Sequence, residues 1–316
     1  MISATIQGST RAAKSDWPEI IYEFNAMGGP CALRITGAET HILDYAARKA
    51  VEEVRRIEQK YSRYLPESWV SRVNNEAGTG KLLEVDEETS YLLDFADNLH
   101  RHSDGCFDIT SGVLSRAWNF RKGLIPSREQ INALLPLVNW KMVCRQQGLI
   151  ALIRKGMEID FGGIGKEYAA DRACACLRNE GVSHGYINLA GDISLVGPQP
   201  DGAGWILGIR DPRRDNAMMK VMELGEGALA TSGNYERYVD CSGIRYGHVL
   251  DARTGWPVNN WQSISVVGPS CTAAGAVCTL AMMAGDATLP FLRDQGLPFV
   301  ALDSQGAVFE SVLEAA

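Results

Sequence analysis

Residues 160–171 read DFGGIGKEYAAD and run from a glycine-rich turn straight into a predicted helix. Glycines at a helix entrance leave backbone N–H groups exposed at the positive end of the helix dipole, and Lys166 adds a positive charge beside them. The segment could therefore seat a phosphate group. Because it contains neither the P-loop pattern nor the GxGxxG fingerprint, a tight turn from strand to helix explains it equally well.

The segments on either side combine helices and strands without a regular βαβ repeat. Apolar residues recur at helical spacing over residues 40–61, which predicts one long amphipathic helix. Glycine- and alanine-rich helices are predicted at 165–180 and 272–284. Two strands are expected within residues 18–36, turning at 27–30, and further β-like runs cover residues 149–153, 186–196, 205–209, 221–224 and 263–267. This mixture predicts an α+β fold with a largely antiparallel sheet and packed helices, rather than a Rossmann fold.

Short polar patterns mark the starts of further helices. Ser68 is expected to cap a short helix that runs to Asn75, and Asp86 is expected to cap the helix that follows. Ser127 followed by Gln130 matches a capping box ahead of an apolar stripe. These patterns predict where helices begin but not how the helices pack.

Composition limits the possible classes of protein. The chain has 316 residues, of which 46% are hydrophobic and 22% charged, which is enough for a buried core and excludes wholesale disorder. No internal repeat or Pro/Ser linker divides it, so residues 1–316 are predicted to form a single domain. The formal net charge of −7, without a Lys/Arg tract, argues against nucleic acid as a partner. The N-terminus lacks an apolar stretch of signal-peptide length and no later stretch could span a bilayer, which predicts a cytoplasmic location.

Three further segments hold more glycine and polar residues than a buried core needs. Residues 104–112 crowd acids and hydroxyls into a turn, which a helix cap alone would explain. Residues 190–193 place a glycine inside an apolar run, which indicates a bulge or a close backbone approach. Residues 231–257 contain His248, which could act as a general base for a hydroxyl, with Asp251 either orienting it or capping a turn. A structural role for His248 fits the pattern equally well.

Taken in order, these segments resemble the motifs of the FAD:protein FMN transferases, the ApbE-type flavin transferases. The match runs from about residue 20 to about residue 285. It comprises the Met27-Gly28-Gly29 turn, residues 62–74 (S-x-Y…S-x-x-S-R-x-N), 105–112 (G-x-F-D-(I/V)-T-x-G), 160–171 (D-x-G-G-I-x-K-G-Y-A-x-D), 188–192 (N-x-G-G-D) and 231–257 (TSG…H-x-(I/L)-D-x-R-T-G-x-P). Each motif is weak alone, but together they predict the ApbE-like fold, which is related to the T-fold, and a flavin pocket.

The resemblance implies an enzyme that cleaves the pyrophosphate of FAD and attaches FMN, through its phosphate, to a Thr or Ser of a partner flavoprotein. It implies that His248 assists deprotonation of the acceptor hydroxyl. It also implies a Mg²⁺ ion held by the Thr279 hydroxyl and by a backbone carbonyl of the glycine-rich turn, at Gly163. The residues implied to line the FAD site are Met27, Tyr64, Cys106, Phe107, Asp108, Asp160, Lys166 and Leu250.

Several positions depart from the family's pattern. Glu167 and Ala190 each replace a glycine, Gly275 stands where the family has its metal-binding Asp, and Cys278 occupies the position of a second acid found in some members. Mg²⁺ normally takes at least one carboxylate, so the loss of one could slow pyrophosphate cleavage by about a thousandfold. The alternative function is therefore an FAD-binding protein of the same fold that holds FAD intact. On this reasoning, Gly275→Asp is expected to restore metal-dependent cleavage.

Overall fold

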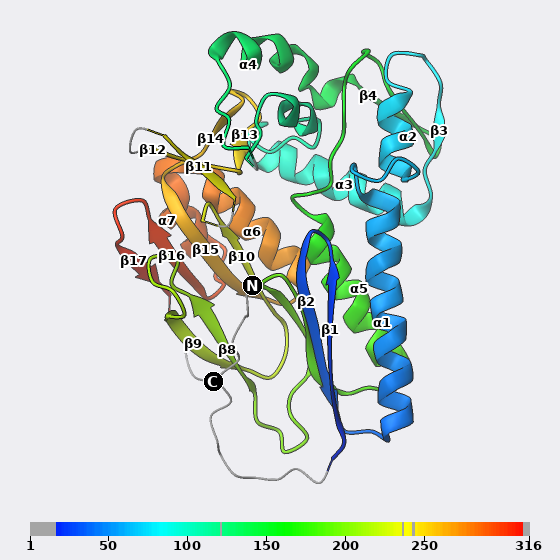
Figure 1. The fold of residues 1–316 in the computed structure, drawn as a ribbon, viewed down its shortest axis with the longest axis vertical. Helices are drawn as coiled ribbons and strands as arrows, with labels where there is room; N and C mark the ends of the chain where they lie inside the picture. The colour runs from blue at the N-terminus through cyan, green and yellow to red at the C-terminus, as the bar shows by residue number, and fades with distance from the viewer. Residues whose placement is uncertain (1–16, 121, 236, 242–243, 312–316) are drawn as a thin grey trace.

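A single antiparallel sheet forms the centre of the fold. The computed structural model describes residues 17–120, 122–235, 237–241 and 244–311. In spatial order the strands of this eight-stranded sheet are β1 (Glu19–Ala26), β2 (Gly29–Thr36), β6 (His184–Leu189), β7 (Asp192–Gly197), β10 (Ala228–Gly233), β15 (Trp261–Gly268), β16 (Phe299–Asp303) and β17 (Val308–Glu310) (Figure 1). Every neighbouring pair is antiparallel, which confirms the predicted sheet type.

Three helices pack against one face of this sheet. They are α1 (Thr40–Tyr61), α5 (Gly165–Asn179) and α6 (Cys271–Met283), close to the predicted helices. Alternate strand residues such as Leu33, Ile187 and Ala230 are buried with the apolar stripes of these helices in the main core. Helix α6 packs on β10 and β15, whereas α5 packs on β6 and β7 and also contacts α6. The start of α5 therefore lies among elements that are far apart in the sequence.

A ribbon of β8 (Trp205–Arg210) and β9 (Met218–Leu224) forms a second layer. Tyr186, Leu195 and Leu229 of the large sheet join Trp205 and Leu207 of the ribbon in a separate apolar cluster. These sheet residues alternate with those that contact the helices, so the two layers use opposite faces of the sheet.

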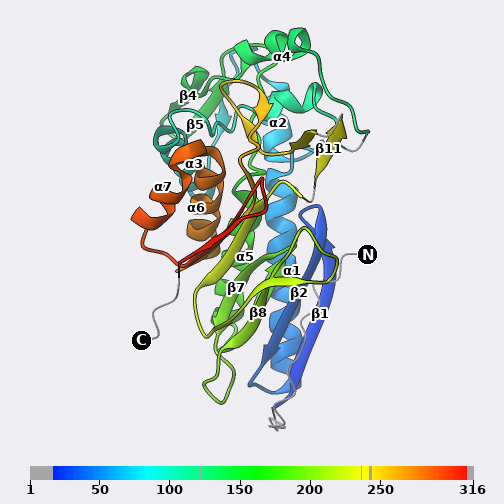
Figure 2. The ribbon, with the colours of Figure 1, turned by 90° about the vertical axis from the view of Figure 1, so that its left-hand side faces the viewer.

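The other elements gather mainly at one end of the sheet (Figures 1 and 2). These are α2 (Trp69–Asn75), β3 (Leu83–Glu84), α3 (Glu87–His102), α4 (Arg128–Leu134), β4 (Val143–Gln146), β5 (Leu149–Leu152), β11 (Tyr238–Cys241), β12 (Ile244–Gly247), β13 (Leu250–Asp251) and β14 (Trp256–Pro257). Helix α7 (Thr288–Asp294) packs on α6 instead. Short 3-10 helices lie at Gly112–Arg116, Leu135–Leu137, Trp140–Met142 and Gly285–Ala287.

The predicted helix caps are confirmed. The Ser68 hydroxyl accepts a hydrogen bond from the Ser71 N–H, and the Asp86 carboxylate accepts one from the Thr89 N–H. Ser127 and its partner three residues on form the complete capping box at the start of α4. Each cap satisfies a backbone donor that the helix itself leaves unpaired.

The single strand expected at residues 186–196 is wrong. The chain forms two antiparallel strands there, β6 and β7, joined by a turn in which Ala190 and Gly191 have φ of 51° and 103°. The Asn188 side chain accepts a hydrogen bond from the Gly191 N–H at 2.8 Å and stabilises the turn. The glycine therefore marks a chain reversal and not a bulge. The apolar pattern did not reveal this because it continues on both sides of the turn.

The sequence predicts neither a signal peptide nor a membrane-spanning segment, and the described residues bear only on the second prediction. Residues 1–16, on which the prediction about a signal peptide rests, lie outside the described residues, as does Glu236 in the 231–257 segment. Among the helices that the structure describes, none is both long and apolar enough to cross a membrane.

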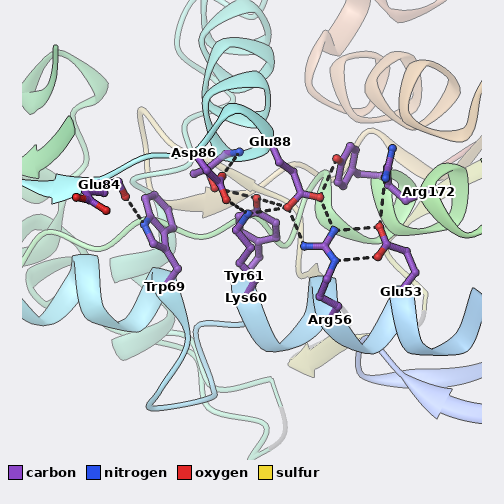
Figure 3. A network of polar contacts seen from close by, with 11 residues as sticks. Glu53, Arg56, Lys60, Tyr61, Trp69, Glu84, Asp86, Glu88 and Arg172 are labelled. Carbon is purple, nitrogen blue, oxygen red and sulfur yellow. Dashed lines mark hydrogen bonds and ion pairs between the residues drawn. The ribbon is translucent and has the colours of Figure 1, made fainter. Parts of the chain in front are cut away.

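A network of ion pairs joins α1 to α3 and α5 (Figure 3). The Glu88 carboxylate of α3 accepts hydrogen bonds from Arg56 at 2.5 Å and from Lys60 at 2.7 Å, both on α1. The Tyr168 hydroxyl of α5 donates to the same carboxylate at 3.0 Å. Burial alone would raise the pKa of Glu88, but the hydrogen bonds from Arg56 and Lys60 outweigh it and lower the pKa to about 2.

Glu88→Gln is expected to lower the free energy of unfolding by about 2 kcal/mol at pH 7, because it leaves two partly buried cations without their shared partner. The folded-state pKa lies below the ordinary value of 4.5, so this stabilisation is present above pH 4.5 and is lost as the pH falls towards 2. Urea denaturation of both proteins between pH 7 and 3 measures the effect. Glu52→Gln, which removes an exposed pair with Lys49, is the control and should cost less than about 0.5 kcal/mol. An equal loss in both variants at pH 7 would contradict the prediction.

Candidate active site

The glycine-rich turn before α5 contacts the loop at residues 106–110. The Asp160 N–H donates to the Ile109 carbonyl at 2.8 Å, and the Asp160 carboxylate accepts from the Gly162 N–H at 2.8 Å. At Gly163, a Cβ atom would lie 3.1 Å from the Phe107 ring, so a larger residue would push the two segments apart. The structure thus brings Phe107, Asp160 and Gly163 together, as their separate motifs suggested.

The Cys106–Asp108 turn is fixed by its own hydrogen bonds. The Asp108 carboxylate is buried and accepts from the Thr110 N–H and hydroxyl, at 2.7 and 2.6 Å, and from the Trp140 N–H at 2.9 Å. The Cys106 carbonyl accepts from the Ala252 N–H at 2.9 Å, which joins this turn to the loop after His248. Burial raises the pKa of the Cys106 thiol to about 12, so this sulfur is a packing group and not a nucleophile.

Lys166 contacts the first residue of β7, and the Met27 turn contacts the β6–β7 turn. The Lys166 ammonium pairs with the buried Asp192 carboxylate at 2.6 Å, and the same carboxylate accepts from the Thr231 N–H at 3.0 Å. Met27 has a φ of 54°, and its N–H donates to Glu58 of α1 at 2.7 Å. In the same turn, a Cβ atom at Gly29 would lie 2.8 Å from the Ala190 side chain, so the Met27 turn and the β6–β7 turn are in contact.

His248 follows β12 and lies close to two cations. A Cβ atom at Gly28 would lie 3.2 Å from the Arg237 guanidinium, which places Arg237 against the Met27 turn. His248 is exposed. The surrounding chain nevertheless removes part of its hydration, and this desolvation, together with the positive charges of Arg237 and Lys166, lowers the pKa of His248 to about 4. The imidazole is therefore neutral at pH 7 and has a lone pair available to accept a proton.

Tyr64 is exposed, whereas Leu250 is partly buried. Tyr64 is 77% exposed, and its ring lies 5.8 Å from the Arg63 guanidinium, which also pairs with Asp160 at 3.4 Å. Leu250 lies in β13 and packs against the apolar cluster that contains Trp118. The structure thus links Tyr64 to the glycine-rich turn through Arg63, and it gives Leu250 a packing role.

Thr279 and Gly275 lie one turn apart on the same face of α6. The Thr279 hydroxyl lies 3.4 Å from that of Ser232 on β10. A Cβ atom at Gly275 would lie 2.6 Å from Cγ of Glu167, so the Glu167 side chain occupies the space that a side chain at position 275 would need. Within the described residues, no group of three or more His, Cys, Asp or Glu side chains is arranged to hold a metal ion.

Sequence reasoning missed the role of Asp171. Its carboxylate accepts from the backbone N–H groups of Cys271 and Thr272, both at 2.8 Å, and from the Thr272 hydroxyl at 2.7 Å. It also accepts from the Ser194 hydroxyl at 3.0 Å. Asp171 therefore fixes the start of α6 against α5. Its place at the end of the DFGGIGKEYAAD segment was the available signal, but its partners lie about a hundred residues away.

Two surface hollows lie away from this group. One is lined mainly by residues of β9, β15 and β16, including Met222, Val267 and Phe299. The other lies beside β9 and includes Asp211, Arg213 and Glu310. Neither contains a predicted site residue, so the candidate site is defined by the contacts described above.

The fold defines the class of protein first. The structure superimposes on the ApbE protein of Thermotoga maritima with a TM-score of 0.85 at 30% sequence identity, covering 93% of this chain and 97% of that one. It superimposes on the flavin transferase ApbE from Vibrio cholerae with a TM-score of 0.82 at 22% identity, covering 93% and 97%, a likeness that concerns the fold alone.

Sequence comparison then gives the family. The ApbE family matches residues 27–300. The chain is 30% identical over 238 residues to the FAD:protein FMN transferase of Chlamydia pneumoniae, covering 72% of each protein. It is 28% identical over 255 residues to the enzyme of the same name from Vibrio cholerae, covering 79% of this chain and 75% of that one. This chain belongs to the ApbE family.

Proposed function

We propose that this chain is an FAD:protein FMN transferase whose flavin site surrounds the start of α5, and that residues 1–316 form one flavin-binding domain whose motifs lie between about residues 20 and 285. The observation that supports it most is the convergence of the Met27, Cys106–Asp108, 160–166 and His248 segments around that helix start. Backbone N–H groups at a helix N-terminus, with cations such as Lys166 and Arg237 nearby, suit a pyrophosphate. Met27, Tyr64, Phe107, Asp160 and Leu250 contact the remainder of FAD in this proposal.

The proposed reaction transfers the FMN half of FAD to a hydroxyl. The oxygen of an acceptor Thr or Ser attacks the phosphorus on the FMN side of the pyrophosphate, and the hydroxyl proton passes to the neutral imidazole of His248. The bond from that phosphorus to the bridging oxygen breaks, and AMP leaves with the electron pair. In this proposal Lys166, which pairs with Asp192, and Arg237, which lies against the Met27 turn, stabilise the negative charge that develops on the phosphates. The acceptor is a partner flavoprotein.

A divalent metal, Mg²⁺, is part of the proposal. When bound, it would neutralise charge on the pyrophosphate. Thr279 would contribute its hydroxyl and Gly163 its backbone carbonyl. A Mg²⁺ site normally needs at least one carboxylate ligand. Among the described residues Glu167 offers one, because its Oε2 atom is buried beside α6 without a hydrogen-bond partner. The residues present therefore suit a hard cation.

The test of the function is the fate of FAD. The whole chain is incubated with FAD and Mg²⁺, with and without a chelator, and the products are separated by chromatography. The proposal expects, when an acceptor flavoprotein is added, covalent flavin on the acceptor and release of AMP, both of which the chelator abolishes. Intact FAD that stays bound to the protein after prolonged incubation with Mg²⁺ and acceptor would contradict it and would favour a protein that only holds FAD.

A further inference from the structure

The contact between α5 and α6 contains a space that two residues share. Position 275 is a glycine, and an ideal Cβ atom there would lie 2.6 Å from Cγ, 3.2 Å from Cδ and 3.2 Å from Oε1 of Glu167. Carbon atoms in contact normally stay about 3.5–4.0 Å apart. A side chain at position 275 and the present conformation of Glu167 therefore exclude each other. The Glu167 carboxyl group therefore lies in the space that an acidic side chain at position 275 of α6 would occupy.

The Glu167 carboxylate is buried without full compensation. The residue is only 7% exposed, and its Oε2 atom has no hydrogen-bond partner among the described residues. An unpaired buried carboxylate is costly for the fold, because a neutral residue of similar shape would fill the space without that cost. A bound cation would remove the cost.

The surroundings of Glu167 match a small site for a hard cation. Glu167 lies in the first turn of α5, a few residues after Gly163 and its proposed carbonyl ligand. Its side chain covers Gly275, and Thr279 lies one turn further along the same face of α6. The carboxylate from α5, the hydroxyl from α6 and the carbonyl oxygen from the turn before α5 are all ligand types that Mg²⁺ accepts.

We infer that Glu167 supplies the metal-binding carboxylate of this chain from α5, in place of the acid that the resemblance expects at position 275 of α6. The inference rests on the proposed function, which gives the metal its role. It also connects two departures from the family's pattern that the sequence alone left separate. An acid stands at position 167 where a glycine is expected, and a glycine stands at position 275 where an acid is expected.

The geometry changes the expected effect of Gly275→Asp. Contrary to the sequence prediction, we expect no gain in metal-dependent cleavage from this variant alone, because the new Cβ atom would lie 2.6 Å from Cγ of Glu167 and bring a second carboxylate beside it. The informative variant moves the acid instead of adding one. Glu167→Gly/Gly275→Asp removes the collision and keeps one carboxylate in the same space.

Metal affinity is the direct test. Mn²⁺ serves as a paramagnetic probe for the Mg²⁺ site, and its binding to the full chain is followed by electron paramagnetic resonance with FAD present. Chromatography confirms that FAD is still intact during the measurement. Glu167→Gln, which keeps the shape but removes the charge, should raise the Kd for Mn²⁺ by at least about tenfold. Glu167→Gly/Gly275→Asp should stay within about threefold of the parent, and Glu180→Gln, the same change at the far end of α5, should not alter the Kd.

Thermal unfolding separates a metal ligand from a residue that only fills space. Without metal, Glu167→Gln should melt no lower than the parent, and it should lose the increase in Tm that Mn²⁺ gives the parent. A lower Tm with unchanged Mn²⁺ affinity would overturn the inference. If Glu167→Gln does not fold, the double variant decides, since a folded double variant without Mn²⁺ binding also overturns it. Failure of the proposed function gives a different result, because the parent would then bind Mn²⁺ but release no AMP when an acceptor flavoprotein is added.

Discussion

His248→Ala is expected to slow FMN attachment to an acceptor flavoprotein by about 10²–10⁴-fold while leaving FAD binding within about threefold of the parent. The neutral imidazole accepts the hydroxyl proton in the proposed reaction, whereas the affinity for FAD depends on many other contacts. Covalent flavin is measured by fluorescence on a denaturing gel, and FAD affinity by quenching of flavin fluorescence. His102→Ala, which removes an exposed imidazole at the end of α3, is the matched control. Equal transfer rates in both variants would contradict the assignment.

The pH dependence of transfer tests the same residue. Desolvation and the charges of Arg237 and Lys166 lower the pKa of His248 to about 4, and only the neutral form can accept a proton. The rate of transfer at low FAD concentration should therefore hold from pH 7 downwards and fall only as the pH approaches 4. Arg237→Gln should move this decline to higher pH, because it removes a positive charge beside the imidazole. Arg245→Gln, on the neighbouring strand β12, should leave the profile in place. A decline centred near 6.5 in the parent would refute this electrostatic account.

Asp171→Ala is expected to cost about 3 kcal/mol of folding free energy, the largest loss of stability predicted for this chain. The substitution removes the acceptor of four hydrogen bonds, two of them from backbone N–H groups at the start of α6. Those donors cannot pair within the helix. Urea denaturation at pH 7 measures the loss. Asp240→Ala, which removes an exposed pair with Arg245, should change stability by less than about 0.5 kcal/mol.

Asp171→Asn distinguishes the charge from the capping geometry. The amide keeps one acceptor oxygen but turns an NH₂ group towards donors, so it should destabilise the protein by about half as much as alanine. Since α6 carries Thr279, a shift of its first turn should also weaken Mn²⁺ binding. A loss below about 1 kcal/mol for Asp171→Ala would show that Ser270, the N-cap residue of α6, is sufficient without Asp171.

Much of the site was predictable because its motifs are local. A short stretch of about ten residues is enough to recognise the glycine turn before α5, the Met27 turn or the polar segment around His248. The structure brings these segments together. Their order along the chain carried the resemblance to the ApbE-type flavin transferases. The hydrogen-bond partners of individual side chains could not be predicted. An example is Asp108, whose carboxylate accepts three hydrogen bonds from within the protein.

The amino-acid pattern was sufficient for most of the helices and for their caps, because helical spacing and capping side chains act between neighbours in the chain. The lack of a regular βαβ repeat was sufficient to indicate the antiparallel sheet. The tertiary structure alone decided that Glu167 fills the space beside Gly275 and that Asp171 fixes the start of α6. These contacts join residues that are remote in sequence, and they exist only because α5 and α6 pack side by side on the same sheet. Local propensity contains no information about which side chain will occupy a space between two helices. Packing and the avoidance of overlap settle it.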